Sequence, residues 1–282
     1  MAQRLAEWVE NEVLRVDDRA PSWLNEMYFF RDPWRPQFVD TSHFFAPADG
    51  VILYQKVVKP GESIVDIKGK SYSLREALRD PNYNKESIVI GIFMTFFDVH
   101  INRVPYRGTL SYRELEPIET YNRPMLDLEN ELLYELRVNL SNTRYLRFNQ
   151  RMVNRIESPI IRQSYYVLQI ADYDVDCITP FRLKQNVRVQ QGARFSQIRR
   201  GSQVDLIVPL SERFDFTFVH EDTDHVQAGV DRLLRVEPKR SQVFTLSSLR
   251  QARATSRVNG RHWPSVATNW VSPVAPGSSR SM

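Results

Sequence analysis

Cysteine, glycine and long apolar runs are scarce in this chain of 282 residues. Its one cysteine, Cys177, excludes an intramolecular disulfide and a cysteine-rich zinc or iron–sulfur site. The ten glycines form no G-x-G-x-x-G motif. Ile64 stands where a P-loop ending in Gly69-Lys70-Ser71 would need its first glycine. The sequence therefore predicts no common nucleotide-binding loop.

The chain also lacks segments that would insert into or cross a membrane. No run of eighteen or more apolar residues occurs, so we expect no transmembrane helix. Residues 1–16 lack the apolar stretch of a secretory signal and are too acidic for a transit peptide. These absences favour a cytoplasmic protein.

Charge is distributed unevenly along the chain. Residues 238–282 hold seven Lys or Arg residues and no acidic residue, whereas residues 1–237 hold 31 basic and 34 acidic residues. The tail is rich in Ser, Pro, Gly and Asn, which is typical of a flexible segment. Trp263 and Trp270 leave contact with anionic lipid or nucleic acid open as an alternative to a solvated tail.

Residues 1–43 form an aromatic-rich extension. One predicted helix face carries the apolar residues Leu5, Trp8, Val9, Val13 and Leu14. Further aromatic residues follow it: Trp23, Tyr28, Phe29, Phe30 and Trp34. Such side chains suit either a membrane interface or packing over a core, and the acidic polar face argues against an anionic membrane.

Residues 44–237 are predicted to form one strand-rich domain. The expected strands are 51–58, 63–67, 87–94, 164–171, 204–210 and 214–220, and residues 126–136 have helical spacing. Residues 59–62 would join the first two strands in a hairpin, and the apolar run 87–94 is typical of a strand buried on both faces. The predicted fold class is α+β, with a strand-rich mixed sheet or sandwich-like core, peripheral helices and a single main domain.

Three segments of this domain carry residues suited to nucleophilic chemistry. They are APADG (46–50), FDVHINRVP (97–105) and GARFSQIRRGSQVD (192–205). An Asp, a His and a Ser in different loops could form a nucleophile, its base and an orienting group. The chain order identifies no mechanism, because unrelated folds use every order. The absence of G-x-S-x-G disfavours an α/β-hydrolase.

Together with IKGKSYSL (67–74) and FNQR (148–151), these segments resemble the phosphatidylserine decarboxylase family in order and spacing. Members of this family are self-processing, pyruvoyl-dependent enzymes. The resemblance spans residues 44–210 and is to the shorter bacterial and archaeal-type members. Longer members usually have Leu-Gly-Ser-Thr at the processing site, where this chain has Arg200-Gly201-Ser202-Gln203.

The resemblance implies that Ser202 Oγ attacks the carbonyl carbon of Gly201. The chain would then be cut between these residues, and position 202 would become the pyruvoyl cofactor. His100 would act as base and proton donor, because imidazole exchanges protons near neutral pH. Asp49 would orient the imidazole. The β fragment 1–201 and the α fragment 202–282 would stay associated through the strand that follows the cut.

Other polar residues support less specific expectations. Four arginines could hold an anionic group of the substrate, with ordinary surface charge as the alternative: Arg103, Arg194, Arg199 and Arg200. Asp98 lies two positions before His100, so both would share one face of a strand. His220 and His225 miss the H-E-x-x-H spacing by one position, so we expect no metal.

The leading hypothesis is a zymogen of phospholipid biosynthesis that converts phosphatidylserine to phosphatidylethanolamine and CO2. The enzyme would associate peripherally with membranes, its assembly as a homodimer is left open, and no nucleic acid partner is expected. One alternative keeps the chemistry but acts on a free amino acid or a related amine. Another is a non-catalytic lipid- or nucleic-acid-binding relative, which the presence of Asp49, His100 and Ser202 disfavours.

Overall fold

The computed structural model describes residues 1–67, 70–118, 122–172, 177–199 and 201–239. Residues 1–239 form one compact unit. Nearly all of the predicted basic tail, residues 238–282, lies outside the described residues. Its predicted flexibility therefore stays a prediction.

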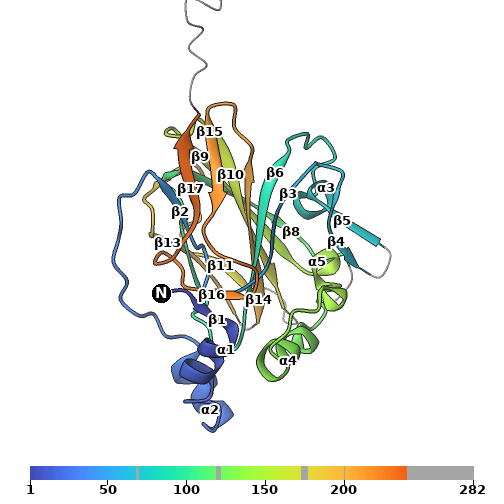
Figure 1. Ribbon diagram of the computed structural model, residues 1–282, viewed down its shortest axis with the longest axis vertical. Helices are drawn as coiled ribbons and strands as arrows, with labels where there is room; N and C mark the ends of the chain where they lie inside the picture. The colour runs from blue at the N-terminus through green and yellow to red at the C-terminus, as the bar shows by residue number, and fades with distance from the viewer. Residues whose placement is uncertain (68–69, 119–121, 173–176, 200, 240–282) are drawn as a thin grey trace, which may run out of the picture. The chain divides into compact units, whose positions relative to one another are not determined.

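A nine-stranded antiparallel sheet forms the centre of the described unit (Figure 1). Its strands, in spatial order, are β1 (Gln3–Arg4), β16 (Asp224–Val226), β3 (Gly50–Val58), β6 (Ser87–Met94), β14 (Ser202–Pro209), β10 (Gln163–Ala171), β9 (Arg151–Ser158), β8 (Gly108–Leu115) and β12 (Val187–Val189). In its centre, β14 pairs with β6 on one side and with β10 on the other.

Three smaller sheets and several short helices surround this sheet. The smaller sheets are β11 (Ile178–Pro180), β13 (Arg194–Ile198) and β7 (Ile101–Arg103); β15 (Phe214–Phe218), β17 (Arg232–Pro238) and β2 (His43–Phe45); and β4 (Ser63–Ile67) with β5 (Lys70–Ser73). The helices are α1 (Leu5–Trp8), which continues as the π-helix η1 (Val9–Val13), α2 (Pro21–Trp23) with the π-helix η2 (Leu24–Tyr28), α3 (Leu74–Leu78), α4 (Leu126–Tyr134), the 3-10 helix η3 (Leu140–Asn142) and α5 (Tyr145–Phe148).

Hydrophobic cores lie on both faces of the central sheet. Successive side chains of a strand point to opposite faces, so the uniformly buried β6 and β14 need cover on both. Val89 and Phe93 of β6 pack in the core that contains residues of α1, α3 and α4. Ile90 and Ile92 pack in the other core, with residues of β2, β13 and β17. Figure 1 shows these helices and small sheets around the central strands. The arrangement confirms the predicted α+β class.

The individual elements test the predictions from periodicity. Strands are found at the predicted segments, and the predicted helix at 126–136 is α4. The predicted hairpin is wrong, because β3 pairs with β6 and β16, whereas β4 pairs with β5. The long apolar β3 is buried by joining the central sheet. In the N-terminal helix, four of the five predicted apolar positions are buried, but Leu14 is exposed.

The described residues include no helix long and apolar enough to cross a membrane.

Candidate functional site

Gly201-Ser202, the predicted processing site, lies at the end of the central sheet where β14 begins and where β6 and β10 end. Ser202 is the first residue of β14, and it stands opposite Met94, the last residue of β6, and Ala171, the last residue of β10. The Ser202 side chain is fully buried, and its Oγ lies 3.2 Å from the Sδ atom of Met94. Gly201 immediately precedes the strand and is also buried.

His100 reaches the same end of the sheet from the segment between β6 and β7. It is fully buried, and its Nδ1 lies 3.0 Å from the carbonyl oxygen of Asp98. The imidazole stacks on Phe29 with 4.0 Å between ring centroids. The His100 carbonyl oxygen accepts a hydrogen bond from Ile198 N, four residues before Ser202. Because Asp98 and His100 lie in a non-strand segment, the predicted shared strand face is wrong.

Asp49 has a cationic partner that the sequence did not indicate. Its carboxylate forms two 2.5 Å contacts with the Arg35 guanidinium and accepts a 2.8 Å hydrogen bond from Ala228 N. Both side chains are buried. Gly50 has φ +148°, and a Cβ there would lie 2.0 Å from the Phe93 carbonyl oxygen. Glycine thus allows the chain to turn from Asp49 into β3 against β6. Arg35 thus holds the Asp49 carboxylate, and the orienting role of Asp49 toward the His100 imidazole stays a prediction.

A second buried carboxylate contact, between Asp98 and the imidazole of His225, was missed by the sequence analysis. Asp98 Oδ1 is 2.6 Å from Nε2 of His225, and its Oδ2 accepts hydrogen bonds from the amide and hydroxyl of Thr95. Burial alone would raise the pKa of Asp98, but His225 and Thr95 hold it below its ordinary value. His225 also stacks on Trp8 at 4.1 Å. The only sequence signal for His225 was the rejected metal motif.

Two of the four predicted substrate-binding arginines lie together in the described part of the chain. Arg199 is exposed, and Arg200 lies outside the described residues. Arg103 and Arg194 share Asp32 as an ion-pair partner, at 3.4 and 2.9 Å.

Arg103 is the most buried of the three that are described. Its Nη1 donates a 3.0 Å hydrogen bond to the Gly192 carbonyl oxygen, whereas its buried Nε has no partner among the described residues. Burial and the neighbouring guanidinium groups of Arg35 and Arg194 lower the pKa of Arg103. Three guanidinium groups therefore share the carboxylates of Asp32 and Asp49 here.

Two further carboxyl groups, which the sequence analysis also missed, flank the predicted cleavage bond. A Cβ on Gly201 would lie 3.0 Å from Asp172 Oδ2 and 3.7 Å from Glu129 Oε2. Glu129 lies on α4, and Asp172 directly follows β10. In the sequence, Glu129 was only one polar position of an amphipathic helix.

The other face of β14 carries a buried polar network beyond Ser202. Asp205 accepts hydrogen bonds from the Tyr54 hydroxyl, at 3.0 Å to each oxygen, and from Gln203 Nε2 at 2.6 Å. Gln203 Oε1 in turn accepts a 2.7 Å hydrogen bond from the Tyr145 hydroxyl. Burial raises the pKa of Asp205 to about 7, although these donors oppose the shift. The network ties β14 to β3 and α5 on the C-terminal side of the predicted cut.

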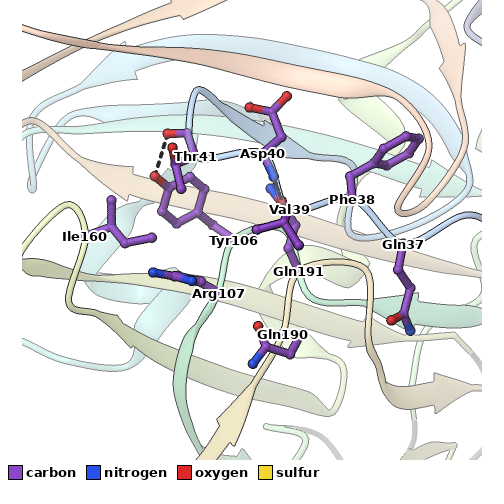
Figure 2. A pocket seen from close by; sticks show the side chains of 10 residues that line it. All are labelled: Gln37, Phe38, Val39, Asp40, Thr41, Tyr106, Arg107, Ile160, Gln190 and Gln191. Carbon is purple, nitrogen blue, oxygen red and sulfur yellow. Dashed lines mark hydrogen bonds between the residues drawn. The ribbon is translucent and has the colours of Figure 1, made fainter.

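A separate small cavity of about 140 Å³ lies on another part of the unit (Figure 2). Its lining comes from residues 37–41, 106–107, 160 and 190–191. Polar groups in this lining bind one another: the Tyr106 hydroxyl donates to the Thr41 carbonyl oxygen at 2.7 Å, and Asp40 N donates to Gln191 Oε1 at 2.9 Å. Ser202 and His100 do not line it, so we do not assign the chemistry to this cavity.

Comparison with known proteins points to one family. Residues 26–233 match the family model described as phosphatidylserine decarboxylase. A phosphatidylserine decarboxylase proenzyme of Chlorobium phaeobacteroides is 28% identical over 183 residues, which are 65% of this chain and 68% of the relative. One from Magnetococcus marinus is 25% identical over 217 residues, 76% of this chain and 79% of the relative. One from Chlorobium limicola is 30% identical over 186 residues, 65% of this chain and 68% of the relative.

Proposed function

Because the chain belongs to the phosphatidylserine decarboxylase family of carboxy-lyases, we propose that it converts phosphatidylserine to phosphatidylethanolamine and CO2. The observation that carries the proposal is the position of Gly201-Ser202. Gly201 immediately precedes and Ser202 begins the central strand β14, at the end of the sheet where His100 is buried. A hydroxyl, a glycine carbonyl and an imidazole are the groups that cleavage by serine attack requires.

Self-processing at this pair would give the pyruvoyl group. Ser202 is the residue from which the group would form, and Gly201 has no side chain to hinder attack on its carbonyl carbon. When present, the group supplies an electrophilic carbonyl that binds the substrate amine and accepts electrons as CO2 leaves. The strand after the cut keeps its pairing with β6 and β10, which would hold the fragments 1–201 and 202–282 together.

His100 is the proposed base for Ser202 Oγ and the proposed proton donor in decarboxylation. Its stacking on Phe29 and its contact with the Asp98 carbonyl oxygen restrict the orientation of the ring. Asp49 supports the site in our proposal by binding Arg35, which anchors the N-terminal segment beside the imidazole.

Arg103 is the proposed anchor for an anionic group of the substrate. A buried guanidinium with an unpartnered Nε offers a directed donor to a phosphate or carboxylate oxygen. Arg35 and Arg194 add positive charge around it. Phosphatidylserine carries both kinds of oxygen on its head group.

The segment that covers His100 supports a proposed peripheral association with membranes. Phe29 and Arg31 of this segment contact the site, the latter through a 2.6 Å hydrogen bond to the Phe97 carbonyl oxygen. Neighbouring apolar side chains are exposed to solvent: Trp23, Met27, Phe30 and Trp34. These side chains suit the interfacial region of a bilayer, from which a lipid substrate must come. The proposal includes localisation at the cytoplasmic membrane surface and assembly as a homodimer.

The substrate is tested by measuring CO2 release from phosphatidylserine vesicles and from free amino acids. We expect release from the lipid, with none from the free amino acids. CO2 release from a free amino acid, with none from phosphatidylserine, would contradict the proposed lipid substrate. The same vesicles, floated through a density gradient with the protein, test membrane association, and a protein that floats with no lipid composition would contradict it.

A further inference from the structure

Two carboxyl groups lie against Gly201, the residue whose carbonyl carbon is attacked in the proposed processing reaction. Glu129 reaches it from α4 and Asp172 from the residue after β10. Glu129 Oε1 accepts a 2.7 Å hydrogen bond from Phe96 N, so its Oε2 is the oxygen that faces Gly201. Asp172 Oδ1 accepts a 2.9 Å hydrogen bond from Met125 N, and its Oδ2 likewise faces Gly201.

The surroundings of Glu129 keep a proton on its carboxyl group at neutral pH. Glu129 is 3% exposed, and the carboxylates that act on it come from two other elements: Asp172 after β10 and Asp98 after β6. Burial, with the negative charge of Asp172 and Asp98, raises the pKa of Glu129 to about 8, although the Phe96 amide opposes the shift. A neutral carboxyl can donate a proton, which a carboxylate cannot.

We propose that Glu129 is the acid that protonates the amide nitrogen of Ser202 during self-processing. As the Ser202 Oγ–Gly201 C bond forms, the base removes the hydroxyl proton. As the Gly201 C–Ser202 N bond breaks, Glu129 gives its proton to that nitrogen. The products are an ester and a free amine, and transfer of the hydroxyl proton from the base to the Glu129 carboxylate restores both groups. This inference rests on the proposed self-processing.

The step needs such an acid for a chemical reason. An amine anion is a very poor leaving group, so the C–N bond breaks only if the nitrogen receives a proton in the same step. Ser202 Oγ supplies a proton to the base on its own side of the bond. A carboxyl group beside Gly201 supplies the proton for the Ser202 nitrogen. The base then does not have to reach both Ser202 Oγ and Ser202 N.

The experiment follows cleavage of the full chain after a short pulse of cell-free synthesis, by mass spectrometry of denatured samples. Four chains are compared: wild type, Glu129→Gln, Glu129→Asp and Asp127→Asn. The last removes an exposed carboxylate from the same helix and serves as the matched control. Gln keeps the shape of a neutral glutamic acid but transfers no proton. We expect Glu129→Gln to cut ~10²–10³-fold more slowly and Asp127→Asn to cut at the wild-type rate. Glu129→Asp should recover part of the loss.

The pH profile separates proton donation from a structural role. The wild-type rate should fall as the pH rises above about 8, where Glu129 loses its proton, and the residual Glu129→Gln rate should lack this fall. Glu129→Gln cutting at the wild-type rate would overturn the inference, as would a wild-type rate that does not fall above pH 8. The wild-type pH profile tests the inference even if a variant fails to fold. A wild-type chain that is never cut would instead overturn the proposed function, and this inference with it.

Discussion

The two ends of the central sheet differ in whether their charged side chains are buried or line an open groove. At the end where β14 begins, Asp49, Asp98 and Glu129 are buried; Asp49 is paired with the buried Arg35 guanidinium and Asp98 with the buried His225 imidazole. At the opposite end, an open groove of about 790 Å³ is lined by five basic side chains and one acidic one: Lys85, Arg107, Arg155, Arg162, Arg188 and Glu157. Burial of a charged side chain shifts its pKa and requires a hydrogen-bonding or oppositely charged partner. Charged side chains in water interact only weakly with one another. This contrast supports our proposal that the chemistry takes place at the end where β14 begins, which we call the closed end.

The largest effect is expected from Ser202→Ala, which removes the proposed nucleophile at the closed end. The variant should stay one uncut chain with no decarboxylase activity. Its stability should change little, because the hydroxyl makes only a weak contact with the Met94 sulfur. Denaturing mass spectrometry and CO2 release measure the two outcomes. Ser164→Ala, at the open end, is the matched control and should be cut and active like the wild type. A cut Ser202→Ala chain would contradict the assignment.

A smaller effect is expected from Arg35→Ala, which leaves the buried Asp49 carboxylate without its cation. Breaking one partner of a buried ion pair costs about 3–5 kcal/mol of unfolding free energy. Urea unfolding should show this loss, whereas Arg15→Ala, in the same extension but exposed, should lie within about 0.5 kcal/mol of wild type. Processing should also slow, because the segment that holds Phe29 over His100 loses its anchor. Equal stability of the two variants would show that Arg35 does not hold Asp49 in solution.

How far the sequence predicts this site depends on whether a residue lies in a local motif. Asp49, His100 and Ser202 could be proposed as site residues because each lies in a short segment that resembles a family motif. Their meeting at one end of the sheet depends on strand order, since β14 lies beside β6 although more than 100 residues separate them. The same strand order explains why the predicted hairpin is wrong. The apolar strand β3 pairs with the apolar strand β6 and not with β4, the next strand in the sequence.

The partners of these residues could not be predicted from the sequence, for a related reason. Arg35 looked like one more charge in an aromatic extension, and Glu129 like the polar side of a helix. His225 was considered only as a metal ligand. Each acquires its role from a contact with a residue far along the chain, and no spacing in the sequence records such a contact.

The smallest effect is expected from Arg155→Gln in the open groove. Arg155 is half exposed, and its ion pair with Glu157 at 3.6 Å is solvated, so the change should alter the unfolding free energy by less than about 1 kcal/mol. Cleavage and CO2 release should stay within twofold of wild type, a ratio worth about 0.4 kcal/mol. Loss of either activity would mean that the open end takes part in the reaction, and the contrast between the two ends would fail.

The central claim is that the chain cuts itself at Gly201-Ser202 and carries a carbonyl group at the new end. The most direct test is the intact mass of the purified wild-type protein under denaturing conditions, with and without borohydride. We predict two fragments, 1–201 and 202–282, the second blocked at its N-terminus and altered in mass by carbonyl reduction. A single chain of 33.1 kDa that does not react with borohydride would contradict the claim.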